Sequence, residues 1–207
     1  MKKIMKKIIL IGAGGHCVSC IDVIELGKKF SIYGLIDNGN KKKLLGYKII
    51  GKDGDLNNIS KKVQYAVVTL GQIKNFQIRE KIFNKILKIG FKIPSIISPL
   101  SYVSNKAIVG KGSIVMHGAI INAGAKIGKN CIINSKALVE HNVIVEDNCH
   151  ISTGATINGG SKIKKNTFIG SCSVVKQNIK IGKNSFINAN IFVDKDLKEN
   201  SLVYEKK

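Results

Sequence analysis

The chain has 207 residues, of which 44% are hydrophobic, and it carries a formal net charge of +21. This apolar content is enough for two small folded domains and excludes a disordered chain. No apolar stretch approaches the roughly twenty residues that span a bilayer, and the basic start MKKIMKKIILIGAGG lacks a signal-peptide cleavage pattern. We therefore expect a cytoplasmic protein without membrane insertion.

The positive charge comes almost entirely from lysine. All but one of the 34 basic residues are Lys, spread along the chain, and the single arginine is Arg79. Arginine is the usual bidentate reader of phosphates and bases, and few aromatic residues lie among the lysines. We expect no nucleic-acid partner and interpret the lysines as a solvated coat that attracts small anions such as nucleotides.

The first part of the chain alternates predicted strands and helices. We predict strands at 7–11, 31–36, 65–70 and 92–97, and helices at 18–28 and 73–89. This alternation favours a small parallel sheet of the nucleotide-binding type. The glycine turn GAGGH, residues 12–16, follows the first strand, where backbone amides and a helix N-terminus can meet a phosphate.

The glycine turn is a weak motif by itself. A dinucleotide fingerprint needs a third glycine where this chain has Cys17, but Asp37 ends the second strand, where carboxylates often hold ribose hydroxyls. We expect a nucleotide or nucleotide sugar, with NAD and a purely structural domain as alternatives. Both prolines lie within 94–104, and we place the domain boundary there, giving domains 1–97 and 98–207.

The second part of the chain has a period of six residues. From Val103 to Val193 every sixth residue is Val or Ile, sixteen times without a break. This period belongs neither to a helix nor to an ordinary strand. Mostly small residues two positions before each aliphatic residue, and frequent Gly or Asn after it, predict coils of three short parallel strands and about eighteen residues.

The five cysteines are expected to be reduced. Cys131 and Cys149 fall at inward small-residue positions of the solenoid, where a thiol serves as an apolar filler. Cys17 and Cys20 form a C-x-x-C on the first predicted helix, but no second pair completes a zinc set. We therefore expect packed thiols and no metal.

His141 interrupts the solenoid pattern. It stands where most repeats have Gly, Asn or Lys, so we expect its imidazole to project from a coil. A histidine titrates near neutral pH and suits a general base. From the spacing alone, a surface or subunit-packing role fits this residue as well as catalysis does.

Three motifs together resemble a known family. IILIGAGGH at the start, followed by NSKALVEH and CHISTGA in the solenoid, resembles the sugar acyltransferases that include sialic acid O-acetyltransferases and the nucleotide-sugar N-acetyltransferases of the bacillosamine and perosamine pathways. The resemblance covers nearly the whole chain. It implies a Rossmann-like α/β domain followed by a left-handed parallel β-helix. It also implies acetyl-CoA as co-substrate and a homotrimer with active sites between neighbouring solenoids.

The resemblance assigns roles in the solenoid by position. His141 corresponds to the general base, Asn134 to a polar residue facing the same cleft, and His150 to a histidine that contacts the acetyl group. The positions along the CoA arm correspond to Gly159, Ser171 and Ala189.

In the first domain, the resemblance assigns a nucleotide-sugar site. The phosphate-facing loop corresponds to Gly14, Gly15 and His16. The nucleoside contacts correspond to Asp37 and Asn38, and the glycine after the third strand to Gly71.

Two departures from the family pattern bear on activity. Many relatives carry Asp or Glu directly after the base, where this chain has Asn142, and an amide stabilises an imidazolium less than a carboxylate does. Glu140 precedes the base, and we expect its side chain to point the other way. The usual G-V-P-A-K-type tail is replaced by SLVYEKK, whose Lys206 and Lys207 are either CoA phosphate contacts or part of a solvated tail.

An amine is a good nucleophile once neutral and needs only a modest base. We therefore expect acetyl-CoA-dependent N-acetylation of a nucleotide-activated amino-deoxy-sugar for surface glycan biosynthesis. The alternatives are O-acetylation of a sialic acid or related sugar, and a non-catalytic trimeric scaffold that binds sugar nucleotides.

Overall fold

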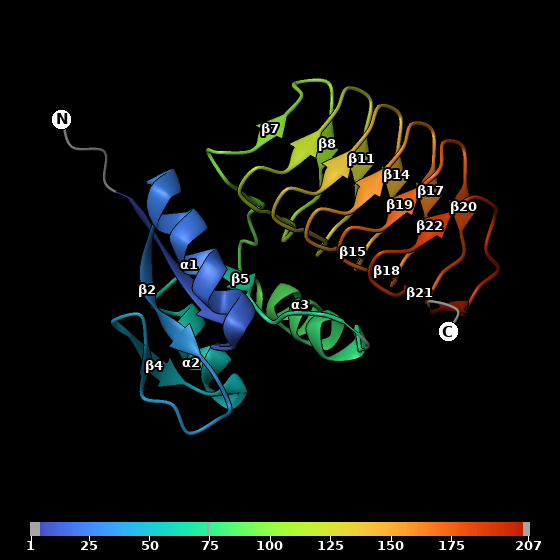
Figure 1. The fold of residues 1–207 in the computed structure, drawn as a ribbon. Helices are drawn as coiled ribbons and strands as arrows, with labels where there is room; N and C mark the ends of the chain where they lie inside the picture. The colour runs from blue at the N-terminus through green and yellow to red at the C-terminus, as the bar shows by residue number, and fades with distance from the viewer. Residues whose placement is uncertain (1–4, 74, 205–207) are drawn as a thin grey trace.

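The computed structural model describes residues 5–73 and 75–204 and places an α/β domain beside a long solenoid (Figure 1). The sheet of the α/β domain has the strand order β3-β4-β2-β1-β5. β1, β2, β4 and β5 pair in parallel, whereas β3 and β4 form an antiparallel hairpin. The elements are β1 (Lys6–Ile11), α1 (Gly15–Gly27), β2 (Phe30–Ile36), β3 (Lys43–Leu44), β4 (Tyr47–Gly51), η1 (Asp53–Asp55), α2 (Leu56–Ser60), β5 (Tyr65–Val68) and α3 (Gln77–Ile89).

Helices cover both faces of this sheet. Ile8 and Leu10 of β1 pack in one cluster with the buried face of α1, whereas Ile9 and Ile11 pack in another with residues of α2 and α3. Alternation of side chains along a strand that is buried on both faces explains why β1 reads as a continuous apolar run. The predicted α/β architecture is confirmed, and the β3–β4 hairpin and α2 are additional elements that were not predicted.

The largest differences between prediction and structure concern the second predicted helix and the fourth predicted strand. The helix predicted at 73–89 begins at Gln77, whose backbone amide donates to Oδ1 of Asn75 at 2.8 Å, an Asx-type turn at the start of the helix. The strand predicted at 92–97 is divided. Lys92 makes an isolated bridge with Tyr65, whereas the last two residues form β6, which pairs with β9 of the solenoid. Pro94 lies between these two pairings and has no N–H to donate.

The solenoid is a three-sided parallel β-helix. Face 1 consists of β6-β9-β12-β15-β18-β21-β23, face 2 of β7-β10-β13-β16-β19-β22, and face 3 of β8-β11-β14-β17-β20. The strands are β6 (Ile96–Ile97), β7 (Tyr102–Val103), β8 (Ile108–Val109), β9 (Ile114–Val115), β10 (Ile120–Ile121), β11 (Lys126–Ile127), β12 (Ile132–Ile133), β13 (Leu138–Val139), β14 (Ile144–Val145), β15 (His150–Ile151), β16 (Thr156–Ile157), β17 (Lys162–Ile163), β18 (Phe168–Ile169), β19 (Val174–Val175), β20 (Lys180–Ile181), β21 (Phe186–Ile187), β22 (Phe192–Val193) and β23 (Leu202–Val203).

The six-residue period forms the core of the solenoid. All of its aliphatic positions, from Val103 to Val193, belong to one cluster, either buried or packed against it. Cys131 and Cys149 lie in the same cluster as free thiols, and burial raises the pKa of Cys131 to about 12. The predicted coil and the packing role of these cysteines are therefore confirmed. Reactive cysteines need a stabilised thiolate, which this interior opposes.

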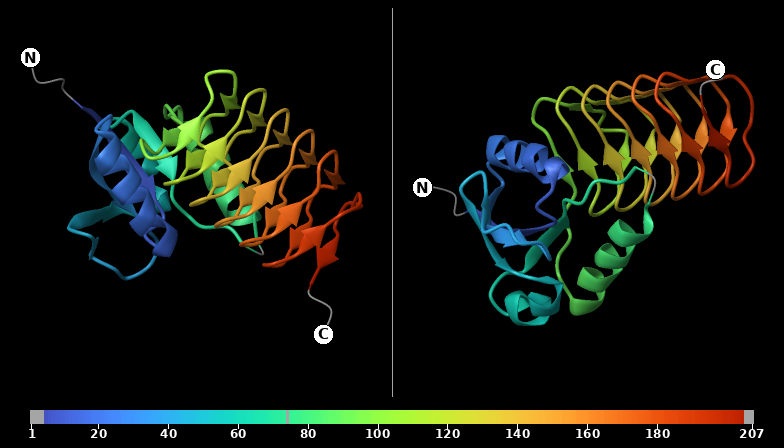
Figure 2. Two further views of the ribbon diagram at one scale, coloured as in Figure 1. Left: turned by 45° about the horizontal axis from the view of Figure 1, so that its top comes forward. Right: turned by 60° about the horizontal axis from the view of Figure 1, so that its bottom comes forward.

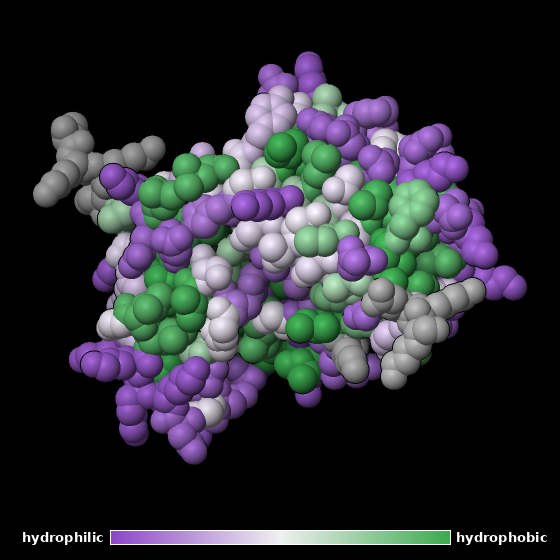
Figure 3. All heavy atoms as spheres, viewed as in Figure 1, coloured by the Kyte–Doolittle hydropathy of each residue, from purple (hydrophilic) through white to green (hydrophobic). Residues whose placement is uncertain are grey.

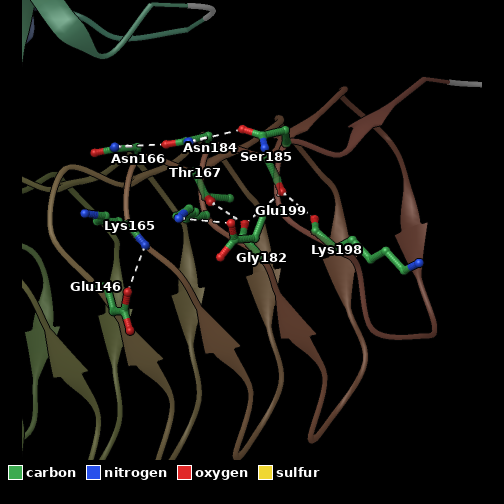
Figure 4. A network of polar contacts seen from close by, with 11 residues as sticks. Glu146, Lys165, Asn166, Thr167, Gly182, Asn184, Ser185, Lys198 and Glu199 are labelled. Carbon is green, nitrogen blue, oxygen red and sulfur yellow. Dashed lines mark hydrogen bonds and ion pairs between the residues drawn. The ribbon is translucent and has the colours of Figure 1, made fainter.

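Asparagine side chains connect successive coils at the corner between face 3 and face 1. The amides donate to one another over 2.9–3.2 Å along a column in which every backbone φ is positive. Asparagine tolerates this left-handed conformation better than most residues. The column, called here the asparagine ladder, consists of Asn130, Asn148, Asn166, Asn184 and Asn200. Figure 4 shows Asn166 and Asn184 of this ladder, with the hydroxyls of Thr167 and Ser185 directed at the Gly182 carbonyl.

The N-terminal domain packs against face 1. Ile96, Ile114 and Met116 on this side of the solenoid share a cluster with α1. A carboxylate oxygen of Asp22 in α1 lies 2.8 Å from Nε2 of His117, and the Ser98 hydroxyl lies 2.7 Å from Nδ1 of the same ring. Residues 69–73, which follow β5, run along the solenoid (Figure 2, right). Residues that follow β5 therefore lie against the coils.

Candidate functional site

His141 lies at the corner between face 2 and face 3, directly after β13 and Glu140, and is exposed. Its ring covers Gly159 of the next coil so closely that a Cβ there would come within 2.6 Å of the imidazole. The structure thus confirms that the imidazole projects from the coil. Gly159, which the resemblance assigns to the CoA arm, therefore lies directly beside the His141 ring, and a larger side chain there would displace the ring.

Asn142 is the polar partner of the His141 ring, with 3.3 Å between its Nδ2 and Nδ1 of the imidazole. In this orientation the amide donates and the ring proton sits on Nε2. Rotating the amide by 180° presents its oxygen, which holds the proton on Nδ1 and leaves Nε2 able to accept a proton. Glu140 contacts the backbone amide of His141 and the side chain of Asn122, so Asn142 orients the ring.

His150 projects from β15 on face 1 and is only 6% exposed. Its Nδ1 contacts the backbone carbonyl of Gln72, and its Nε2 lies 3.2 Å from Nδ2 of Asn134. Because a carbonyl only accepts, the proton is on Nδ1 and Nε2 is the acceptor. Burial, together with the charge of Arg79, lowers the pKa of His150 to about 4, although the Gln72 contact opposes this shift. The ring is therefore neutral at neutral pH.

The candidate residues occupy two separate corners of the solenoid. Asn134, Ser171 and Ala189 lie where face 1 turns into face 2, beside His150, and the Ser171 hydroxyl is 3.0 Å from that of Ser152. His141 lies at the far edge of face 2. A single chain thus brings Asn134 to His150, but it does not bring either residue to His141.

The glycine turn opens α1, with Gly14 at its N-cap. Gly14 and Gly15 are exposed, and a Cβ at either would meet nothing. His16 lies behind the turn, next to Gly71, and burial, followed by the charges of Arg79 and His150, lowers its pKa to about 3. The turn therefore presents open backbone to one side, while His16 faces the junction with the solenoid.

Asp37 supports the glycine turn. Its carboxylate accepts hydrogen bonds from the backbone amides of Ala13 at 2.7 Å and Gly39 at 2.8 Å. Asn38 exchanges two hydrogen bonds with Asp53, at 2.9 and 3.1 Å. A cavity of about 430 Å³ adjoins these residues, and its lining includes Asp37, Lys41, Lys42 and Lys52. Three lysines beside a glycine turn suit an anionic ligand.

Four residues at the junction were not predicted as site residues: Gln72, Arg79, Glu80 and Asn148. Gln72 donates from its side chain to the Asn148 carbonyl at 2.7 Å, and Asn148 also donates to Glu80 of α3. Arg79 is 1% exposed and donates to carbonyls of both domains. The available signal was that Arg79 is the only arginine in a lysine-rich chain.

Within residues 5–73 and 75–204, no group of three or more His, Cys, Asp or Glu residues is arranged to hold a metal ion. In the same part of the chain, no helix is both long and apolar enough to cross a membrane. Lys206 and Lys207, named above as candidate phosphate contacts, lie outside the described residues.

Comparison with family models identifies three matching segments. Residues 7–86 match the PglD N-terminal domain, residues 124–159 the bacterial transferase hexapeptide (six repeats), and residues 162–195 the hexapeptide repeat of succinyl-transferase. No curated protein sequence matches the chain. Together with the solved structures described next, these matches agree with the left-handed β-helix that the resemblance implied.

Several solved structures are similar over nearly the whole chain. The acetyltransferase domain of PglB from Neisseria gonorrhoeae, in complex with acetyl coenzyme A, is 28% identical, with 96% of each chain covered and a TM-score of 0.91. PerB from Caulobacter crescentus, in complex with CoA and GDP-perosamine, is 26% identical, with 96% of this chain and 94% of that chain covered and a TM-score of 0.89. A histidine-to-asparagine variant of perosamine N-acetyltransferase from the same organism, with the same ligands, is 25% identical, with coverages of 96% and 93% and a TM-score of 0.90.

Proposed function

We propose that this chain, a hexapeptide-repeat acyltransferase with a PglD N-terminal domain, transfers an acetyl group from acetyl-CoA to the amine of a nucleotide-linked amino sugar. The observation that carries the proposal is the junction of the two domains. His16 and Gly71, behind the glycine turn, adjoin the segment that contacts His150. An acceptor site and an acetyl site thus lie next to each other. The likeness to structures that contain acetyl-CoA, or CoA with GDP-perosamine, supports this assignment.

The sugar nucleotide is assigned to the N-terminal domain. The open backbone of Gly14 and Gly15 at the start of α1 suits a phosphate, because the first amides of a helix have no partner within it. Asp37 lines the cavity beside this turn, and Asn38 follows it directly in the chain. These two residues are the proposed nucleoside contacts. The lysines that line the cavity attract the diphosphate.

Acetyl-CoA is assigned to the corner between face 1 and face 2. Ser152, Ser171 and Ala189 have small side chains, which let an extended arm approach the backbone along consecutive coils. Asn134 and His150 lie at the end of this column nearest the N-terminus of the solenoid and are the proposed contacts of the acetyl group. The residues present therefore fit the co-substrate.

His141 is the proposed general base. It accepts the proton that the sugar amine loses as the amine nitrogen bonds to the thioester carbon, and it returns that proton to the sulfur as the carbon–sulfur bond breaks. With the Asn142 amide rotated so that its oxygen accepts from Nδ1–H, Nε2 of His141 is free to accept. His150 is neutral and already donates its only N–H to Gln72, so it positions the acetyl group rather than moving the proton.

A homotrimer is proposed because face 2 packs against no other element within residues 5–73 and 75–204. Its outward residues are apolar or neutral, and Tyr102 and Phe192 are 59% and 65% exposed. The first strands of face 1, β6 and β9, pack against the N-terminal domain, and face 3 presents lysines at the outward positions of β11, β17 and β20. Figure 3 shows hydrophobic and neutral residues over face 2. Packing this face against identical copies would bring His141 of one chain towards His150 of another.

Introducing charge on face 2 is expected to dissociate the trimer. The double variant Ile120→Lys/Val174→Lys places two ammonium groups in the proposed interface, and burying them unpaired would cost several kcal/mol. Light scattering after size exclusion should then give a species of 22.5 kDa. Ile108→Lys, at a 60% exposed position of face 3, is the matched control and should remain trimeric. A monomeric wild-type protein would contradict the assembly.

Asn142→Asp is expected to raise the rate. A carboxylate about 3 Å from the ring stabilises the imidazolium by about 1 kcal/mol at an exposed site, which corresponds to roughly a three- to tenfold gain in kcat. Asp also tolerates the positive φ of 59° at this position. Asn178→Asp changes the same corner two coils away, also at φ 59°, and should leave the pH–rate profile unchanged. An equal gain in kcat in both variants would show that residue 142 does not act on the His141 ring.

The function is tested by incubating the protein with acetyl-CoA and a panel of acceptors. The panel contains UDP- and GDP-linked 4-amino-4,6-dideoxy sugars and free or CMP-linked sialic acids, with thiol release and product mass as readouts. N-acetylated sugar nucleotide is the expected product, whereas product from sialic acids alone would assign O-acetylation. Binding without turnover of any acceptor would favour the scaffold. The free thiols agree with action in the reducing cytoplasm.

A further inference from the structure

Arg79 occupies an unusual position for an arginine. Its guanidinium is buried between the two domains and donates to the carbonyls of Val68 at 2.8 Å, Leu70 at 2.6 Å and Asn130 at 3.3 Å. All three acceptors are backbone carbonyls at the end of β5 or on the asparagine ladder. Within the described part of the chain, Nη2 finds no acceptor. A buried cation without a carboxylate is costly, so its retention points to a positional role.

The three acceptors lie on both sides of one short segment. Val68 and Leu70 begin the connection from β5 to α3, and Asn130 belongs to the solenoid. Lysine presents its donors from a single nitrogen, whereas the planar guanidinium reaches carbonyls in separate directions. The one arginine of the chain thus stands where one cation has to hold two domains by their backbones.

Gln72 lies inside the segment that Arg79 holds. Its side chain donates to the carbonyl of Asn148, one rung below Asn130 on the asparagine ladder, at 2.7 Å. Its own backbone carbonyl accepts from Nδ1 of His150. The position of this carbonyl determines which ring nitrogen of His150 carries the proton, and hence which nitrogen accepts from Asn134.

We propose that Arg79 is a positioning residue for the acetyl site: by holding the Gly71–Gln72 segment against the solenoid, it keeps His150 in the Nδ1–H tautomer. The same segment carries Gly71, which adjoins His16 behind the glycine turn. The geometry of the acetyl site is therefore set from the sugar-nucleotide domain. The consequence for turnover rests on the proposed function, whereas the tautomer does not.

The tautomer can be read directly in the intact protein. The chain has four histidines, so labelling with ¹⁵N-histidine gives few signals, and the one missing from His150→Gln identifies His150. In the wild type without ligands, we expect protonated Nδ1 and unprotonated Nε2 at pH 7, unchanged at pH 5.5. A protonated Nε2 or a mixture of tautomers in the wild type would overturn the proposal, whatever the variants do.

Arg79→Lys keeps the positive charge but removes the planar guanidinium that contacts carbonyls in separate directions. We expect loss of the single tautomer and a rise of about tenfold in KM for acetyl-CoA, the effect of losing one good contact, with a smaller change in kcat. Gln72→Ala removes only the side-chain contact with Asn148 and should shift both readouts in the same direction by a smaller amount. If Arg79→Lys does not fold, the tautomer and KM of Gln72→Ala test the proposal.

Asp22→Asn is the matched control, because it removes the charge from the contact of α1 with His117 and leaves Arg79 and Gln72 in place. It should change neither the tautomer nor KM. The proposal fails if Arg79→Lys or Gln72→Ala folds with an unchanged tautomer, or if Asp22→Asn disturbs His150 equally. A protein with the expected tautomer but no acetyl transfer would refute the proposed function alone.

Discussion

Replacing His141 by alanine is expected to lower kcat/KM for the amino sugar by about 10²- to 10⁴-fold, the contribution of a positioned general base. The ring is exposed at a corner, rests on Gly159 and is oriented by Asn142. Because it contributes nothing to the buried core, its removal should leave the fold intact. Steady-state kinetics with acetyl-CoA and the best acceptor of the panel measure the effect, and circular dichroism verifies the fold.

His117→Ala is the comparison that isolates the base. His117 also projects from the solenoid, but its two ring nitrogens are engaged by Asp22 and Ser98 at the domain junction. This variant should retain wild-type turnover. Equal losses in the two variants would indicate a structural effect, and unchanged turnover in His141→Ala would reject His141 as the base. Affinity for acetyl-CoA should stay within about twofold in His141→Ala, because the CoA arm is assigned to other residues.

Mild acid is expected to destabilise the protein through two buried histidines. Burial lowers the pKa of His16 to about 3 and that of His150 to about 4, whereas both rings in the unfolded chain titrate near 6.5. Between these values the unfolded state binds two protons that the folded state does not, so the free energy of unfolding falls as pH falls through 6.5. From pH 7 to pH 5.5 the loss is about 2–3 kcal/mol for the pair.

Urea unfolding at a fixed protein concentration, at pH 7 and at pH 5.5, measures this difference. His150→Gln should reduce the pH-dependent part by about half, because it removes one of the two protons, even if the variant is less stable at both pH values. A wild-type protein equally stable at both pH values would show that these rings are charged in the folded state.

The solenoid was predictable because its determinant is local and repeated. A Val or Ile at every sixth position has to face inward, since no other arrangement buries all of them, and each coil specifies its own strands and corners. The first strand and the glycine turn were predictable for similar reasons, as a buried run followed by residues with special backbone freedom. The exposure of His141 also followed from its place in the repeat.

The junction between the domains was not predictable. Arg79 was noted only as a lone arginine, and Gln72 has no signal in the sequence, because its contact with His150 is made by a backbone carbonyl that every residue possesses. Asn134 was expected to share a cleft with His141, but in the chain it contacts His150. The period gives the face of each residue, whereas subunit packing decides which faces meet. Contacts between distant segments depend on packing that propensity does not encode.

Three hexapeptides complete one turn of the solenoid. An insertion or deletion that is not a whole turn therefore changes the face on which all later residues lie. Inserting one hexapeptide between Ser152 and Ser171 would preserve the buried period but move every later residue to the next face, so Ser171 and Ala189 would leave the corner of His150. Inserting a whole coil would keep all faces and displace the column by about 4.8 Å along the axis. Relatives of this solenoid are therefore expected to gain or lose whole turns, and to do so beyond the last site residue.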